Sequence, residues 1–168
     1  LEVLRTNPRL AKVRHLALSL MHFEERVFML ADSPHLNLTH LEMPYVKLSE
    51  GELSALLRAP GLSNVRHLDL SYCALGDRHI EMLAQSSWMK GLKHLCLDCN
   101  EIEGAGVEAL AACEHAVDLE SLSLRFNGGR QVYNKRSMGN RGAKALAESE
   151  FLGNLHSLNL SENSIGLE

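Results

Sequence analysis

Apolar residues follow two different periods within one stretch near the middle of the chain, residues 92–110. In its first part Leu92, Leu95 and Leu97 precede Asn100, and alternation of this kind is typical of one face of a strand. In its second part apolar residues recur at helical spacing with small residues between them: Ile102, Val107, Leu110 and Ala111. The pattern predicts a short strand, a turn and a helix, a unit that buries its apolar side only against a neighbour of the same kind.

The same unit recurs along the chain. Its leading apolar position is spaced by 25, 27, 27, 27 and 36 residues and lies at Val13, Leu38, Val65, Leu92, Leu119 and Leu155. A second strand position and a helical anchor keep register with it, at Leu16, Leu41, Leu68, Leu95, Leu122 and Leu158, and at Leu30, Leu56, Leu83, Leu110 and Leu146. Repetition at this period predicts a solenoid.

The pattern L-x-x-L-x-L-x-x-N followed by I-x-G-x-G-x-x-A-L, present as LKHLCLDCNEIEGAGVEAL, resembles the leucine-rich repeat family and its ribonuclease-inhibitor-like class. The resemblance extends over nearly the whole chain. It implies an α/β fold, a right-handed β/α solenoid in which about six short parallel strands line a horseshoe and helices lie outside. We expect a single domain over residues 1–168. Because neither end shows the polar cap of a terminal repeat, we also expect a fragment of a longer protein.

Composition and charge argue against two classes of partner. The net charge is −4, so the chain lacks the basic excess of a nucleic-acid-binding protein. No apolar run approaches the ~20 residues of a membrane span, and residues 1–10 lack the basic start and apolar stretch of a signal peptide. We therefore expect no nucleic-acid partner and no membrane partner.

The cysteines follow the repeat and do not form a disulfide framework. They are Cys73, Cys96, Cys99 and Cys113. Cys73 occupies the position that Asn100 has in the next repeat, where a thiol is a small apolar filler. We expect a reducing compartment, the cytoplasm, and no cofactor. His94-x-Cys96-x-x-Cys99 leaves a metal or redox site open as an alternative.

Polar residues at fixed repeat positions predict local hydrogen bonds. Stacked Asn100, Asn127 and Asn163 are expected to satisfy buried backbone groups, since an amide side chain both donates and accepts. Ser49 is expected to cap a helix with Glu52 three residues later. Pro44 lacks an N–H and is expected to end its strand early.

Residues on either side of the buried leucines are expected to point to the open, concave face. Three columns result: His15, His40, His67, His94, Ser121 and Ser157; Ala17, Glu42, Asp69, Cys96, Ser123 and Asn159; Ser19, Pro44, Ser71, Asp98, Arg125 and Ser161. From these columns we predict the binding residues His40, Glu42, His67, Asp69, His94, Asp98 and Arg125. The four histidines leave three interpretations open: a repeated consensus residue, a pH-sensitive surface or a metal site.

An insertion lengthens the fifth repeat at about residues 128–136, between its strand and its helix. It carries Arg130, Tyr133, Lys135 and Arg136, which we add to the predicted binding residues because insertions in repeat proteins often map to a binding surface. The alternative is a tolerated surface loop, since extra loop length costs little.

These features predict a non-catalytic scaffold that binds a protein or peptide through its concave face and this basic loop. A structural spacer or regulatory segment of a larger multidomain protein is the alternative. Repeats of this class also occur in GTPase-activating proteins of the Ran type, so a GTPase-regulating role, with Arg130 or Arg141 as a contributor, is a third possibility.

Overall fold

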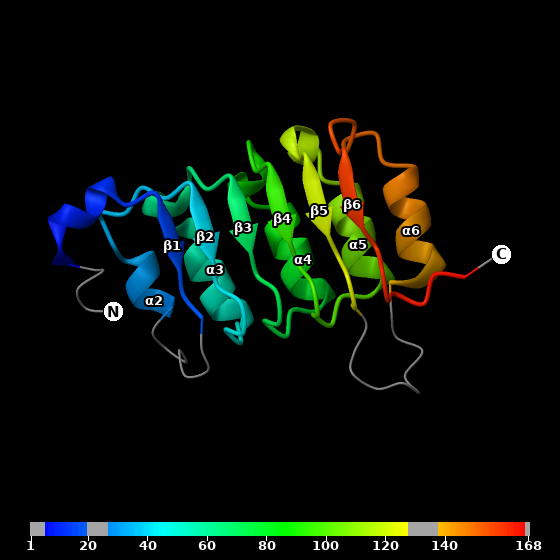
Figure 1. Ribbon diagram of the computed structural model, residues 1–168, viewed down its shortest axis with the longest axis horizontal. Coiled ribbons are helices and arrows are strands. Elements are labelled where there is room, and N and C mark those ends of the chain that lie inside the picture. Colours follow the sequence, from blue (N-terminus) through cyan, green and yellow to red (C-terminus); the bar gives the residue numbers. More distant parts are fainter. Residues whose placement is uncertain (1–5, 20–26, 128–137, 167–168) are drawn as a thin grey trace.

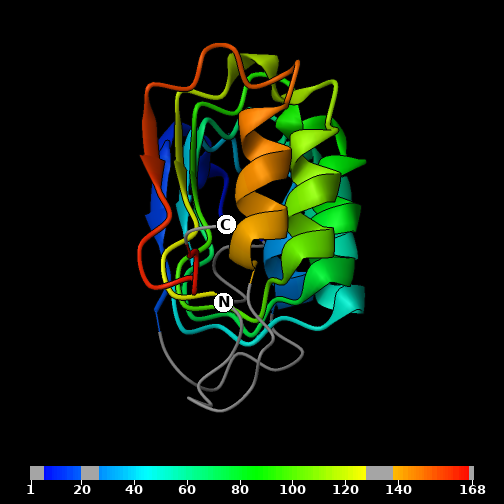
Figure 2. The ribbon, with the colours of Figure 1, turned by 90° about the vertical axis from the view of Figure 1, so that its right-hand side faces the viewer.

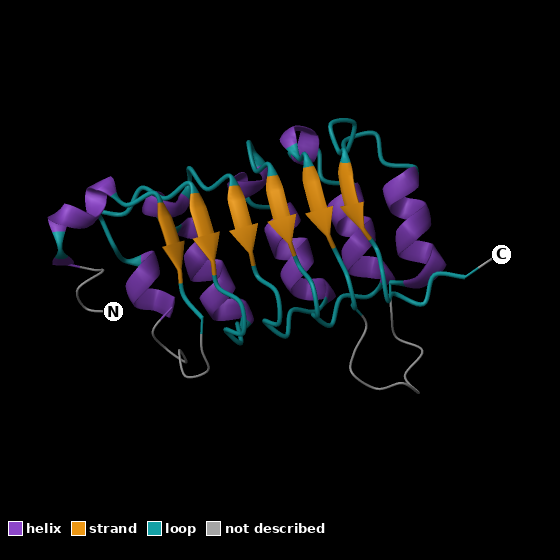
Figure 3. Ribbon diagram, in the orientation of Figure 1, coloured by secondary structure: helices purple, strands orange, loops and turns teal. Residues whose placement is uncertain are grey.

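Six short strands lie side by side in one open, uncurled parallel sheet, in the order in which they occur in the chain (Figure 1; Figure 3). The computed structural model describes residues 6–19, 27–127 and 138–166. The strands are β1 (His15–Ala17), β2 (His40–Glu42), β3 (His67–Asp69), β4 (His94–Cys96), β5 (Ser121–Ser123) and β6 (Ser157–Asn159). Neighbouring strands pair so that His40 lies beside His67 and His67 beside His94, which confirms the predicted repeat register.

Helices cover one face of this sheet and leave the other face open (Figure 2). The α-helices among the described residues are α2 (Val27–Ala31), α3 (Glu50–Arg58), α4 (Asp77–Ala84), α5 (Gly104–Ala111) and α6 (Gly139–Ala147). Short 3-10 helices lead back to the strands: η1 (Pro8–Lys12), η2 (Pro60–Leu62), η3 (Ser87–Met89) and η4 (Ala116–Asp118). The described fold is therefore the predicted α/β solenoid. None of its described helices has the length and apolar character needed to cross a membrane.

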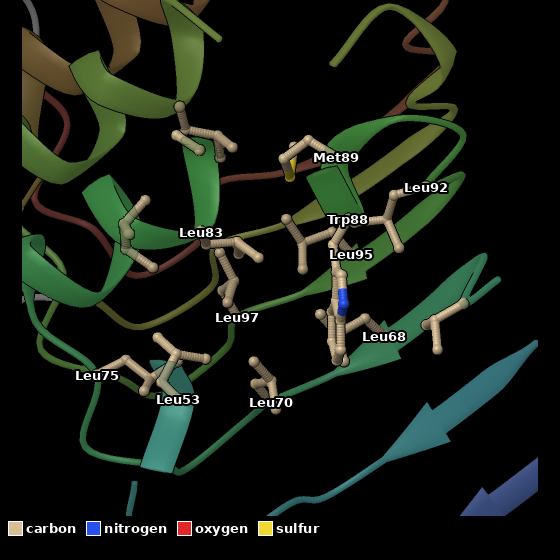
Figure 4. Packing of buried hydrophobic residues seen from close by; sticks show 14 of the residues in the cluster. Leu53, Leu68, Leu70, Leu75, Leu83, Trp88, Met89, Leu92, Leu95 and Leu97 are labelled. Carbon is tan, nitrogen blue, oxygen red and sulfur yellow. The ribbon is translucent and has the colours of Figure 1, made fainter. Parts of the chain in front are cut away.

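An aliphatic core fills the space between the sheet and the helices (Figure 4). The central residue of each inner strand points into it, and Leu41, Leu68 and Leu95 are at most 3% exposed. Burying one such side chain stabilises the fold by about 1.5–3 kcal/mol. Stacked leucines thus hold the strands in register, and the residues on either side of them are left to face outward.

The predicted asparagine ladder is confirmed. Asn100, Asn127 and Asn163 are at most 3% exposed. The Asn127 side-chain amide donates to the carbonyl oxygens of Leu97 and Leu124 at 3.0 and 2.8 Å, and the Asn163 side-chain oxygen accepts from the Asn127 N–H at 2.7 Å. Each asparagine therefore links its own turn of the solenoid to the preceding one.

The predicted start of α3 is also confirmed. The Ser49 hydroxyl accepts from the Glu52 N–H at 3.3 Å, and a Glu52 carboxylate oxygen accepts from the Ser49 N–H at 2.9 Å. This reciprocal pair satisfies two backbone donors that no helical carbonyl reaches. It fixes where the chain turns from β2 into the helical layer.

The expectation that Pro44 ends its strand early is wrong, because β2 has three residues, as every other described strand has. The Met43 N–H donates across to the Asp69 carbonyl of β3 at 2.8 Å, whereas the His40 N–H donates to the Arg14 carbonyl on the β1 side at 2.9 Å. The backbone N–H groups of alternate residues thus point to opposite neighbouring strands. The nitrogen of Pro44, which carries no hydrogen, is on the β1 side. The proline removes no hydrogen bond to β3.

Candidate binding surface on the strand face

The uncovered side of the sheet carries the columns that the sequence predicts. In β2, β3, β4 and β5 the two outer residues are half-buried and the middle leucine is buried. We call this surface the strand face: the outward residues of the six strands together with the residues that immediately follow each strand. The structure brings His40, His67, Asp69 and His94 together on it. Whether these residues bind a partner stays a prediction.

Four histidine rings follow one another along the first column, and those of His40, His67 and His94 are stacked. The ring centroids of His40 and His67 are 3.9 Å apart and those of His67 and His94 are 4.1 Å apart, with interplanar angles of 10° and 17°. The His15 ring is tilted, 5.5 Å from that of His40, and its Nε2 lies 2.8 Å from a Glu42 carboxylate oxygen. The described residues contain no group of three His, Cys, Asp or Glu side chains placed to hold a metal ion.

His67 is the centre of this stack, and its surroundings disfavour its charged form. Its Nδ1 is buried and has no hydrogen-bond partner. Burial lowers the pKa of His67 below its ordinary value, and the neighbouring rings of His40, His94 and His15 lower it further, while Glu120 alone opposes them. The pH-sensitive interpretation of the histidine column stays a prediction, which a titration of His67 tests.

We expect the His67 ring to titrate below pH 6.5 in an NMR titration, because burial and the flanking rings disfavour its protonated form. The unfolded chain then binds a proton more readily than the folded chain. The free energy of unfolding therefore falls as the pH drops from 6.5 toward the folded pKa, and this contribution vanishes above that window. In the double variant His40→Gln/His94→Gln the pKa of His67 should rise toward 6.5, whereas His35→Gln should not change it. A His67 that titrates at or above 6.5 in the parent chain would contradict this result.

The carboxylates of the strand face also fix the turns beneath them. Asp69 accepts a hydrogen bond from the Ser71 N–H at 2.8 Å. Asp98 accepts from the Ser123 hydroxyl at 2.6 Å and from the Arg125 N–H at 2.9 Å, and so joins two repeats. These hydrogen bonds therefore hold both carboxylates in fixed positions on the surface.

Arg125 is not a free cation. Its guanidinium pairs with the Glu162 carboxylate, which raises the pKa of Arg125. The other members of the predicted basic region, Arg130, Tyr133, Lys135 and Arg136, lie outside the described residues. Arg141, which the GTPase-regulator alternative invokes, lies on α6 and donates to both carboxylate oxygens of Glu108 at 2.5 Å. Its guanidinium is therefore engaged within the helical layer.

Cys96 of the two-cysteine motif does not present a reactive thiolate. Burial, together with the nearby Asp69 and Asp98 carboxylates, raises the pKa of the Cys96 thiol to about 12. Burial likewise raises the pKa of Cys73 to about 12. A thiol ligates metal or attacks a disulfide as its thiolate, so these protonated forms argue against the metal or redox alternative.

The structure also reveals residues that the sequence reasoning missed, just past the carboxyl ends of the strands. We call Tyr45, Tyr72 and Phe126 the aromatic row. These residues are 52%, 37% and 38% exposed. The rings of Tyr45 and Tyr72 stack with centroids 4.3 Å apart, and Cys99 occupies the equivalent position between Tyr72 and Phe126. The available signal was the recurrence of an aromatic residue immediately before the ladder position.

The backbone of the aromatic row is left-handed. Tyr45, Tyr72, Cys99 and Phe126 have φ values of 63°, 58°, 55° and 54°. Glycine or asparagine adopts this conformation most readily, and a bulky side chain gains nothing from it. The turn therefore requires the left-handed backbone, but it does not require an aromatic side chain at these positions.

Comparison with known proteins agrees with the repeat pattern. A family model described as "Leucine Rich repeat" matches residues 61–84 and 92–111. These two stretches contain β3 with α4 and β4 with α5, and so include His67, His94 and Tyr72. No curated protein matches the chain.

Proposed function

We propose that this chain, which is a leucine-rich repeat protein, acts as a non-catalytic scaffold that binds a protein or peptide on its strand face. The observation that carries the proposal is the aromatic row. The chain has only eight Trp, Tyr and Phe residues, and three of them are exposed in this row. Tyrosine and phenylalanine are enriched in protein interfaces, where they supply large contact areas at low entropic cost.

The extent of the strand face supports the same proposal. Three outward residues on each of six strands approach the ~20–30 residues that one partner contributes to a standard interface. The stacked histidines and the hydrogen-bonded carboxylates hold these side chains in fixed positions before a partner arrives. Preorganisation of this kind reduces the entropic cost of binding.

The thiols support a cytoplasmic location as part of the proposal. Cys73 and Cys113 are buried in the core, and all four cysteines are free. Free buried thiols are typical of proteins that work in a reducing compartment.

Affinity capture from a cell lysate tests the proposed function. A partner retained by the parent chain is expected to be lost from the double variant Tyr45→Ala/Tyr72→Ala, by about tenfold or more in affinity, because aromatic anchors carry most of the energy of an interface. Alanine keeps the backbone of the turn and removes only the rings. This variant is preferable to charge reversal at Asp69 or Arg125, since both of these residues also make hydrogen bonds or ion pairs within the fold.

Phe28→Ala is the matched control, because Phe28 is a 42% exposed aromatic on α2. It should retain the partner as the parent does. Equal retention by the parent and the double variant would contradict binding through the aromatic row. Empty captures from well-folded samples of both would favour the structural spacer.

A further inference from the structure

We propose that the segment bound along the aromatic row is cationic: an extended stretch of a partner protein that carries arginine or lysine side chains. This inference rests on the proposed function and specifies the partner's chemistry. It combines two properties of one edge of the strand face, its charge and its exposed rings.

The first property is negative charge beside the row. Asp69 precedes Tyr72 by three residues and Glu42 precedes Tyr45 by three, while Asp98 directly precedes Cys99. Among the described residues of the second and third columns, Arg125 is the cation, and its guanidinium already pairs with Glu162; Lys47 is exposed two residues beyond Tyr45, outside these columns. The edge therefore attracts a positively charged segment and repels an acidic one.

His67 and the basic residues near the other end of the strands do not cancel this charge. Burial and the neighbouring rings lower the pKa of His67 and so disfavour its charged form. Arg66 precedes Asp69 by three residues, which places it about 10 Å away along the strand, comparable to the Debye length at physiological salt. Lys93 pairs with Glu120.

The second property is the chemistry of the rings. A guanidinium or ammonium group is attracted to the face of an exposed aromatic ring, and arginine is the more frequent partner. Tyr45, 52% exposed, offers its ring to solvent directly. The neighbouring Cys99 and Tyr45 side chains raise the pKa of Tyr72 to about 12, which favours the neutral phenol form of its ring. Rings and carboxylates side by side form a surface that suits cations better than apolar groups.

The length of the row sets the length of the bound segment. From β2 to β5 it crosses three strand spacings, about 14 Å. An extended chain covers this distance in about four or five residues. The expected ligand is therefore a short extended segment with at least two cationic side chains.

Fluorescence anisotropy with synthetic peptides tests the inference. The probe is a fluorescein-labelled peptide of about nine residues, long enough to span the row, in which Arg alternates with Gly and Ser. Two matched probes replace every Arg with citrulline, which keeps the shape without the charge, or with Glu. We expect the Arg peptide to bind at least about tenfold more tightly than the citrulline and Glu peptides, and to weaken as salt rises.

Variants of the chain locate the site. Tyr45→Ala/Tyr72→Ala should weaken binding of the Arg peptide by about tenfold. Glu42→Gln/Asp69→Asn should weaken it by about threefold and reduce its salt dependence, because the amides keep acceptor oxygens for His15 and Ser71 but lose the charge. Phe28→Ala and Glu114→Gln, which change an exposed ring and an exposed carboxylate elsewhere, should leave the affinity unchanged.

Equal affinity for the Arg and citrulline peptides would overturn the inference. So would unchanged affinity for the Arg peptide in both Tyr45→Ala/Tyr72→Ala and Glu42→Gln/Asp69→Asn. An array of peptides of mixed charge distinguishes an error in the cationic partner from an error in the proposed scaffold function. Retention of neutral or acidic peptides that Tyr45→Ala/Tyr72→Ala abolishes would overturn the cationic partner and leave the scaffold standing. If neither the array nor the Arg peptide shows binding, the result would contradict both the cationic partner and the proposed scaffold function.

Discussion

Replacing Asn100 with alanine is expected to lower the free energy of unfolding by about 3–5 kcal/mol, because several buried backbone groups lose a partner at once. The Asn100 side-chain oxygen accepts from the Cys73 and Leu75 N–H groups at 2.9 and 3.0 Å. Its amide donates to the carbonyl oxygens of Leu70 and Leu97, both at 2.9 Å. Urea denaturation of the parent and variant chains measures the loss.

Two further variants test whether the lost hydrogen bonds of Asn100 cause this loss of stability. Asn100→Asp keeps the size of the side chain but removes its donors and buries a carboxylate, so it should also destabilise the fold strongly. Asn64→Ala removes an exposed amide that donates to the Asn37 side chain at 3.0 Å and should cost less than about 0.5 kcal/mol. A loss below about 1 kcal/mol for Asn100→Ala would contradict the role of the asparagine ladder.

The substitution Gly106→Ala is expected to destabilise the chain by about 1–2 kcal/mol, although alanine is the better helix former. A Cβ at Gly106 would lie 2.6 Å from Asp77 Oδ1 and 3.0 Å from Asp77 Cα. Asp77 cannot move without strain, since the same Oδ1 accepts from the Glu103 N–H at 2.7 Å. The glycine thus permits the close approach of α5 to α4.

Gly51→Ala is the matched control for Gly106→Ala. Gly51 also lies within a helix, α3, but a Cβ there would come no closer than 4.0 Å to its nearest neighbour, Ser49 Oγ. The free energy of unfolding of this variant should rise by about 0.5–1 kcal/mol through helix propensity alone. Thermal or urea denaturation of the two variants should therefore give shifts of opposite sign. Stabilisation by both would show that α4 and α5 do not need the glycine.

The features of this fold that follow from the repeat could be predicted from sequence. Leucines at a fixed period must stack, so the strands, their register and the histidine column are already visible in the spacing. The buried Asn100 and Asn127 are predictable for the same reason, because a polar residue in an apolar column must satisfy nearby backbone groups. The capping pair of Ser49 and Glu52 depends only on local sequence.

Interactions that depend on side-chain direction could not be predicted in the same way. Arg125 and Glu162 are 37 residues apart, across the insertion, so their ion pair appears only once the strands are in place. The spacing puts histidines on adjacent strands but does not determine that the His67 ring stacks on both neighbours and is left with an unpartnered Nδ1. Tyr45 and Tyr72 occupy an exposed turn position that the apolar pattern leaves unconstrained.

Hydrogen–deuterium exchange on the chain with its captured partner is the most direct test of binding through the strand face. We expect the partner to slow exchange in residues 40–46, 67–73 and 94–100, which contain β2, β3, β4 and the start of the aromatic row. Exchange in the helices α4 and α5 should stay as it is in the free chain. Slower exchange confined to these helices, with the strand segments unchanged, would place the partner on the opposite side of the solenoid and contradict the proposed binding surface.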